Sequence, residues 1–215
     1  MPASALPLRS IAVVLLALAC FTAGIWLALP GAPEAEPPAG RVPGLLWPNP
    51  KVLQDFSLTD EDGGAFDRNR LLGRWSLLFF GFTNCPDVCP TTLSVLKQAR
   101  RRLGDAAPPQ VVFVSVDPER DDPATLKRYV DYFDPAIVGV TGAPEALDTL
   151  TRQLGILYMK VGGEAPGEAY TMDHTASILL LDPAARLVGL LSPPHDAAQI
   201  AELVGQIRQF IEARS

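Results

Sequence analysis

Two cysteines, Cys85 and Cys89, lie between a strongly apolar segment and a segment with helical periodicity. The apolar segment, Trp75 to Phe82, is typical of a strand buried on both faces, and a helix is expected to begin near Pro90. In open α/β sheets, ligands bind outside the carboxyl ends of the strands. Two thiols in this position favour electron exchange or the binding of a soft metal ion.

A disulfide that serves only as a staple is the structural alternative for this cysteine pair. In the chain-entropy model, closing a loop of about five residues contributes only about 2 kcal/mol, less than any long-range pairing. A thiolate at Cys89 also lies near the positive end of the expected helix, which lowers the pKa of a thiol and favours its reactive form. Asp87, between the two sulfurs, opposes that effect. The spacing therefore favours metal or redox chemistry over stapling.

The chain has only two histidines, His174 and His195. His174 directly precedes Ser177 to Leu181, which is expected to form a strand. If that strand runs antiparallel to the Trp75–Phe82 strand, His174 lies at the same end of the strands as the cysteines. Two thiolates and one imidazole suit copper, because sulfur is soft enough for Cu(I) and nitrogen holds Cu(II). The alternative for His174 is a hydrogen-bonded residue of the surface or of a loop. His195 is expected near the cap of the last helix.

The other expected elements alternate between strands and helices before a final hairpin and helix. They are a hairpin of Val52–Leu58 with Ala65–Asp67, strands at Val111–Val116, Ile137–Val140 and Ile156–Val161, helices at Pro123–Phe133 and Pro144–Leu154, a polar excursion over Gly162–Met172, a hairpin of Ser177–Leu181 with Leu187–Leu191, and a helix at Ala197–Ala213. This order implies an α/β sandwich with a mixed sheet.

The composition excludes several classes of protein. The 215 residues include 18 Lys and Arg against 24 Asp and Glu, a net charge of −6, which argues against a nucleic-acid binder. Hydrophobic residues make up 48% and charged residues 20%, so the chain as a whole is not disordered. Three cysteines are too few for a mini-protein held by a disulfide framework.

An uncharged apolar run covers Ile11 to Leu29 and contains the third cysteine, Cys20. As a helix it reaches about 28 Å, close to the roughly 30 Å of a hydrocarbon core. A cleavable signal peptide is the alternative, but its apolar region normally has about 7–15 residues. Arg9 is the only charge before the run, so residues 1–10 are expected in the cytoplasm, with the rest facing outward. A bacterial inner-membrane anchor at 11–29 with a periplasmic domain fits best.

Residues 30–50 contain seven prolines, too many for a helix or a central strand. They are expected to form an extended, semi-rigid linker. Residues 51–215 are enough for one domain with a full core.

Three segments together resemble the Sco/SenC family of copper-binding cytochrome c oxidase assembly proteins. They are GFTNCPDVCPTT at 81–92, SVDPERD at 115–121 and DHT at 173–175, and the resemblance covers about residues 50 to 212 in order and spacing. It implies a thioredoxin-like fold, a membrane anchor and one copper ion, Cu(I) or Cu(II), bound by Cys85, Cys89 and His174.

Two acidic residues are expected to act near that site. The resemblance gives Asp173 the role of holding the imidazole or its loop in place. Asp117 follows an expected strand and could lie at the edge of the sheet near the metal. Its alternative is a plain turn between a strand and a helix, where Asp and Pro are favoured.

The resemblance implies delivery of copper to the CuA centre of cytochrome c oxidase subunit II, or reduction of the cysteines of that centre so that copper can enter. The first hypothesis is a metallochaperone without turnover. Other copper chaperones or thioredoxin-like reductases would be further partners. A second hypothesis is a thiol-disulfide oxidoreductase that reduces the CuA cysteines and forms a disulfide between Cys85 and Cys89. Thioredoxin-type enzymes have two residues between their cysteines, and the three found here count against that hypothesis. A third is a copper or redox sensor.

Overall fold

The computed structural model describes residues 12, 17–20, 43–46, 49–104, 108–165 and 168–214. The chain divides into two compact units, Met1–Arg41 and Val42–Ser215. In the first unit, the described residues 12 and 17–20 are helical, and the rest of the expected anchor at 11–29 lies outside the described residues. Within the described ranges, no helix has the length and apolar character needed to cross a membrane.

The second unit is built around a mixed sheet, which has eight strands among the described residues. Across the sheet they are β1 (Lys51–Val52), β10 (Arg186–Leu191), β9 (Ile178–Leu181), β4 (Ser76–Gly81), β5 (Gln110–Ser115), β6 (Ile137–Thr141), β2 (Ser57–Asp60) and β3 (Ala65–Asp67). β4, β5 and β6 are parallel, whereas β9 runs antiparallel to β4, as predicted. Every residue of β4 is buried, as its continuous apolar sequence predicts.

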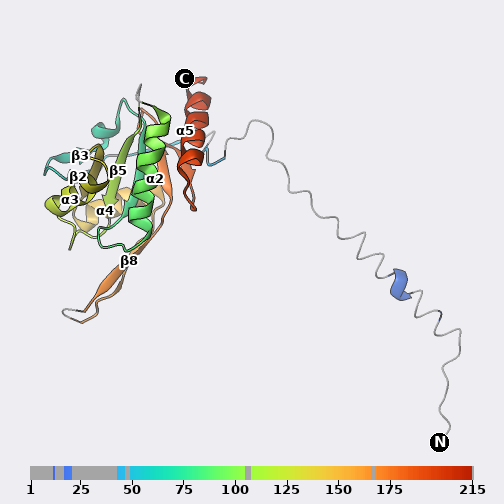
Figure 1. The fold of residues 1–215 in the computed structure, drawn as a ribbon, viewed down its shortest axis with the longest axis horizontal. Coiled ribbons are helices and arrows are strands. Elements are labelled where there is room, and N and C mark those ends of the chain that lie inside the picture. The colour runs from blue at the N-terminus through green and yellow to red at the C-terminus, as the bar shows by residue number, and fades with distance from the viewer. Residues whose placement is uncertain are drawn as a thin grey trace, which may run out of the picture. The chain divides into compact units, whose positions relative to one another are not determined.

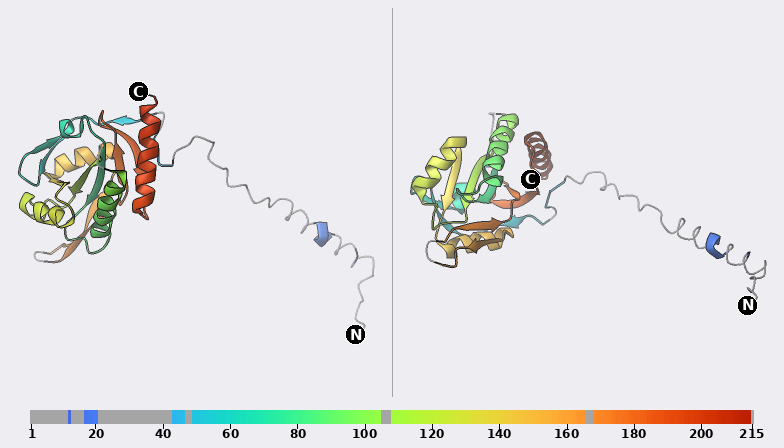
Figure 2. Two further views of the ribbon diagram at one scale, coloured as in Figure 1. Left: turned by 45° about the horizontal axis from the view of Figure 1, so that its top comes forward. Right: turned by 60° about the horizontal axis from the view of Figure 1, so that its bottom comes forward.

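Helices cover both faces of this sheet (Figures 1 and 2). One face carries α2 (Val88–Leu103), α3 (Pro123–Phe133) and α5 (Ala197–Glu212), and the other carries α4 (Pro144–Leu154) and the short 3-10 helix η1 (Arg68–Leu71). Each α-helix on these two faces buries an apolar stripe, which includes Leu93 in α2 and Leu147 in α4. The unit β4–α2–β5, followed by β9, β10 and α5, forms the thioredoxin-like fold that the resemblance implies.

Most of the predicted elements are confirmed. α3 and α4 have the predicted bounds, because each begins with a proline in its first turn. The side chain of Asp122 also accepts a hydrogen bond from the backbone N–H of Thr125, which caps α3. The predicted terminal hairpin corresponds to β9 and β10, and the predicted last helix to α5.

The predicted first hairpin is wrong at its N-terminal end. Ser57–Asp60 pairs with Ala65–Asp67 as expected, but Val52 pairs with Arg186 of β10. Val52 therefore belongs to the opposite edge of the sheet. A short apolar stretch does not reveal its partner, because both edges of a sheet offer unpaired backbone groups.

The end of the expected linker also pairs with β10. The N–H of Leu46 donates to the carbonyl of Val188 at 2.8 Å, and the N–H of Leu190 donates to the carbonyl of Gly44 at 2.8 Å. The structured domain therefore begins several residues before the expected boundary at residue 51.

The segment after α4 forms a ribbon apart from the main sheet. β7 (Tyr158–Gly162) pairs antiparallel with β8 (Tyr170–His174), and the ribbon extends outward near the β8 label in Figure 1. The predicted excursion over Gly162–Met172 is therefore too long at its C-terminal end. His174 is the last residue of β8, a strand that the sequence analysis does not predict, and it comes shortly before β9, as expected.

Gly81 ends β4 where the backbone passes the sulfur of Cys89. A Cβ at Gly81 would lie 2.7 Å from Cys89 Sγ and 2.8 Å from Cε2 of Phe113. We expect Gly81→Ala to lower the free energy of unfolding by about 1–3 kcal/mol, because extra volume in a packed core forces its neighbours apart. Unfolding in urea measures this change.

The matched control for that substitution is Gly205→Ala in α5, where a Cβ meets nothing within 4 Å. This change should raise the free energy of unfolding by up to about 1 kcal/mol, because alanine favours helix. Wild-type stability in Gly81→Ala would contradict the tight packing between β4 and Cys89.

Candidate metal centre

Cys85, Cys89 and His174 meet beyond the carboxyl end of β4. Their two sulfurs and one ring nitrogen all lie within 4.8 Å of one another, and Sγ of Cys89 is 3.6 Å from Nε2 of His174. In the part of the chain that the structure describes, this is the one such group of three or more Cys, His, Asp or Glu side chains. The structure thus brings together the three residues that the sequence singles out.

The cysteine segment is a tight turn that leads into α2. The N–H of Cys85 donates to the carbonyl of Phe82 at 3.2 Å, and the N–H of Cys89 donates to Sγ of Cys85 at 3.4 Å. Asp87, the residue that caps α2, makes no side-chain hydrogen bond to the backbone at this helix end. The Cys85 sulfur therefore serves as an acceptor for the first turn of α2, which fixes the spacing of the two thiols. The two sulfurs are not bonded to each other.

Burial controls the protonation of the two inner groups. Cys89 is fully buried, and burial, followed by its contact with Cys85, raises the pKa of its thiol. From the sequence the helix end and the Asp87 charge oppose each other, and in the structure burial decides the direction of the shift. Burial lowers the pKa of His174, against the opposing effects of the Thr175 carbonyl and the Asp173 charge. Both groups are therefore uncharged at neutral pH, and a bound metal must displace the Cys89 proton.

The imidazole of His174 is held between a backbone carbonyl and two aromatic rings. Its Nδ1 lies 3.2 Å from the carbonyl oxygen of Thr175, so the tautomer with a proton on Nδ1 donates there and leaves Nε2 for a metal. The rings of Phe79 and Phe82 meet the imidazole edge-on, with centroids 6.2 and 6.0 Å away. Asp173 is exposed, so the atom that contacts Nδ1 is the Thr175 oxygen rather than the expected Asp173 carboxylate.

Asp117 lies in the turn after β5 and not among the ligand atoms. It is buried, and its carboxylate accepts hydrogen bonds from Nε of Arg120 at 2.5 Å and from the hydroxyl of Tyr170 at 2.9 Å. Burial and the hydrogen bond to Asp117 raise the pKa of Tyr170 to about 12, so this hydroxyl stays protonated and donates. Asp117 therefore belongs to the turn between β5 and α3, which is the alternative that the sequence offers for it. Its hydrogen bond with Tyr170 also anchors β8.

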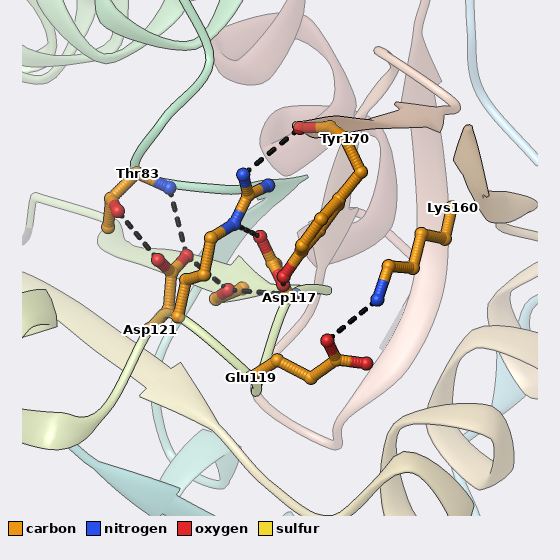
Figure 3. Close-up of polar contacts among 8 residues, drawn as sticks. Thr83, Asp117, Glu119, Asp121, Lys160 and Tyr170 are labelled. Atoms are coloured by element: carbon orange, nitrogen blue, oxygen red, sulfur yellow. Dashed lines mark hydrogen bonds and ion pairs between the residues drawn. The ribbon is translucent and has the colours of Figure 1, made fainter. Parts of the chain in front are cut away.

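Asp121, to which the sequence assigns no role, supports the cysteine segment. Its fully buried carboxylate accepts hydrogen bonds from the N–H of Thr83 at 2.9 Å, from Oγ1 of Thr83 at 2.6 Å and from Oγ of Ser115 at 2.6 Å (Figure 3). Thr83 is two residues before Cys85, so Asp121 fixes the path of the chain into the site. The SVDPERD segment signals this residue, but the direction of each carboxylate depends on the fold.

The remaining histidine and cysteine lie elsewhere. Nε2 of His195 is 2.8 Å from the carbonyl oxygen of Ala176, and His195 directly precedes Asp196, which caps α5. This confirms the expected position of His195 near the last helix. Cys20 is exposed in the first unit and is not part of the cluster.

A model of the SCO1/SenC family matches residues 47–209. The chain is 33% identical over 174 residues to an SCO2-like protein of Rickettsia conorii, and the match covers 79% of this chain and 83% of that protein.

Solved structures show the same fold. The copper-bound structure of ScoI from Arabidopsis thaliana has a TM-score of 0.68 and 35% identity, over 74% of this chain and 99% of that chain. The copper-bound structure of ScoI from Bradyrhizobium japonicum has a TM-score of 0.64 and 38% identity, over 72% and 99%. The chain belongs to the SCO1/SenC family.

Proposed function

We propose that this chain is a copper metallochaperone that holds one copper ion through Cys85, Cys89 and His174. Its acceptor is the CuA centre of cytochrome c oxidase subunit II. The observation that carries the proposal is the meeting of two thiols and one imidazole within 4.8 Å. The copper-bound structures of two similar proteins support the choice of metal, and the role in oxidase assembly rests on the family.

The donor set fits copper. The 4.8 Å spread of the ligand atoms is close to the span of two metal–sulfur bonds of about 2.3 Å each. Thiolate sulfur suits Cu(I), imidazole nitrogen suits Cu(II), and a closed zinc site more often has a fourth protein ligand. With two thiolates, the site carries one negative charge when it holds Cu(I) and none when it holds Cu(II), so both states are tolerated.

The exposure of the ligands sets the order in which an acceptor reaches them. Cys89 is fully buried, whereas Cys85 and His174 are partly exposed. A groove beside His174 is lined in part by Leu157 and Met159, which are 78% and 61% exposed. Acceptor thiols therefore approach from the Cys85 and His174 side and exchange with these ligands first, and Cys89 leaves last.

A thiol-disulfide oxidoreductase is the second candidate, supported by the two unbonded, adjacent thiols. In that reaction, a thiolate attacks an acceptor disulfide to form a mixed disulfide, which the second thiol resolves. The products are an acceptor with two thiols and a disulfide between Cys85 and Cys89. The partly exposed Cys85 would attack, because burial keeps Cys89 protonated.

Copper titration of the full-length protein and of His174→Ala separates the two candidates. For the metallochaperone, we expect His174→Ala to lower the Cu(II) affinity at least about a hundredfold, since loss of a partner outside the ligand set already costs about 10–100-fold. Disulfide-reductase activity is assayed on the same samples. Unchanged copper affinity and spectrum in His174→Ala, together with lost reductase activity, would favour the oxidoreductase.

Copper affinity should also depend on pH through Cys89. Because the pKa of the Cys89 thiol is raised, copper binding at neutral pH releases its proton, so affinity rises by about tenfold per pH unit for that proton. His174, with its lowered pKa, is neutral there and adds no proton. Cu(I) affinities between about pH 7 and pH 9 should show this slope. In Cys89→Ala, copper binding should release one proton fewer, so the affinity should rise about tenfold less per pH unit. An equal slope in both proteins would contradict this assignment.

We also propose that residues 11–29 anchor the protein in a bacterial inner membrane, with residues 1–10 in the cytoplasm and the copper domain in the periplasm. The uncharged run and Arg9 before it support this orientation. The protein should stay in the membrane fraction after an alkaline wash. Release of a soluble form that begins near residue 30 would show instead that the run is cleaved.

A further inference from the structure

The turn at residues 117–121, between β5 and α3, contacts both segments that carry the proposed ligands. On one side, Asp121 accepts two hydrogen bonds from Thr83, in the segment that leads to Cys85. On the other side, Asp117 and Arg120 contact Tyr170, the first residue of β8, which ends at His174. Figure 3 shows Thr83 directed toward Asp121, with Tyr170 near Asp117.

Arg120 is the centre of the contact with β8. Its Nη1 donates to the carbonyl of Tyr170 at 3.1 Å, and its guanidinium carbon lies 3.7 Å from the centroid of the Tyr170 ring. Asp117 accepts hydrogen bonds from both side chains, which fixes them relative to each other. A second ion pair joins the turn to β7, between Glu119 and Lys160 at 2.7 Å, and Lys160 also lies over the Tyr170 ring at 3.9 Å.

These contacts matter because the ribbon of β7 and β8 stands apart from the main sheet. Its residues are exposed or half-buried, so little core packing fixes its position. Arg120 also lies over the ring of Phe82, 5.7 Å from its centroid, and Phe82 packs edge-on against His174. Arg120 therefore acts on the imidazole by two routes, through β8 and through Phe82.

We propose that Arg120, with Asp117 and Tyr170, is a positioning residue that holds His174 against the two sulfurs and so sets the affinity of the site for Cu(II) relative to Cu(I). The inference rests on the proposed function. Two sulfurs alone can satisfy Cu(I), whereas Cu(II) favours nitrogen as well. A displaced imidazole therefore weakens Cu(II) binding far more than Cu(I) binding.

The test compares Arg120→Gln with Arg70→Gln in the full-length protein. Arg70 is a matched control, because it pairs with a buried carboxylate, Asp60, at 3.0 Å and lies over the ring of Phe66 at 5.5 Å, far from the cysteines in the fold. In Arg120→Gln we expect Cu(II) affinity to fall about tenfold or more, Cu(I) affinity to change less than about threefold, and the sulfur-to-Cu(II) charge-transfer band to shift. Arg70→Gln should change none of these.

A double-mutant cycle with His174→Ala separates positioning from a general loss of stability. If Arg120 acts through His174, then Arg120→Gln adds no further loss of Cu(II) affinity once His174 is alanine. Amide hydrogen exchange on the copper-free proteins gives a second readout. The amides of β8 should exchange faster in Arg120→Gln than in wild type, while those of β4 and β5 keep their protection.

Three results would overturn the inference: equal losses for Cu(I) and Cu(II), additive losses in the double variant, or unchanged exchange in β8. Failure of the proposed function looks different, because wild type would then bind no copper, or His174→Ala would bind Cu(II) as wild type does. Those outcomes are read from wild type and His174→Ala before Arg120 is altered.

Discussion

The antiparallel pairing of β4 with β9 is the constraint on which the metal site depends. β4 ends at Gly81, and β9 begins at Ile178, which pairs with Phe79. The chain that leaves β4 and the chain that enters β9 therefore meet at the same end of these strands. If the two strands were parallel, His174 would enter at the other end, about 20 Å away for a strand of this length.

Burial at that edge decides which ions the site can hold. Without metal, Cys89 and His174 are uncharged, so neither leaves an unpaired charge among Phe79, Phe82 and Phe113. A cation that binds here must gain enough from sulfur to remove the thiol proton. Hard cations that prefer oxygen gain little from sulfur, whereas copper gains a great deal, so burial adds selectivity to the donor set.

The sequence predicts well those elements whose burial leaves a periodic signal. α3 and α4 match their predicted bounds, and the three cluster residues are the ones that the motif marks. The ribbon of β7 and β8 was only partly predicted, because its exposed side chains give no pattern that separates it from a loop.

Two further features of the site, which the sequence leaves open, depend on three-dimensional quantities. The shift of the Cys89 pKa follows from how deeply the thiol is buried, whereas the sequence reports only the nearby helix end and the opposing Asp87 charge. The different roles of Asp117 and Asp121 follow from the side to which each carboxylate points.

Those two carboxylates connect the two halves of the site through one short turn. Asp121 holds the cysteine segment with direct hydrogen bonds inside the domain, and the start of α2 fixes the two sulfurs relative to each other. His174 depends instead on a ribbon outside the main sheet, held by the partly exposed Arg120. If Arg120 positions the ribbon as proposed, the imidazole is the ligand whose place depends least on the main sheet. In the proposed metallochaperone, its departure would leave copper on the two sulfurs and open one side of the site to acceptor thiols.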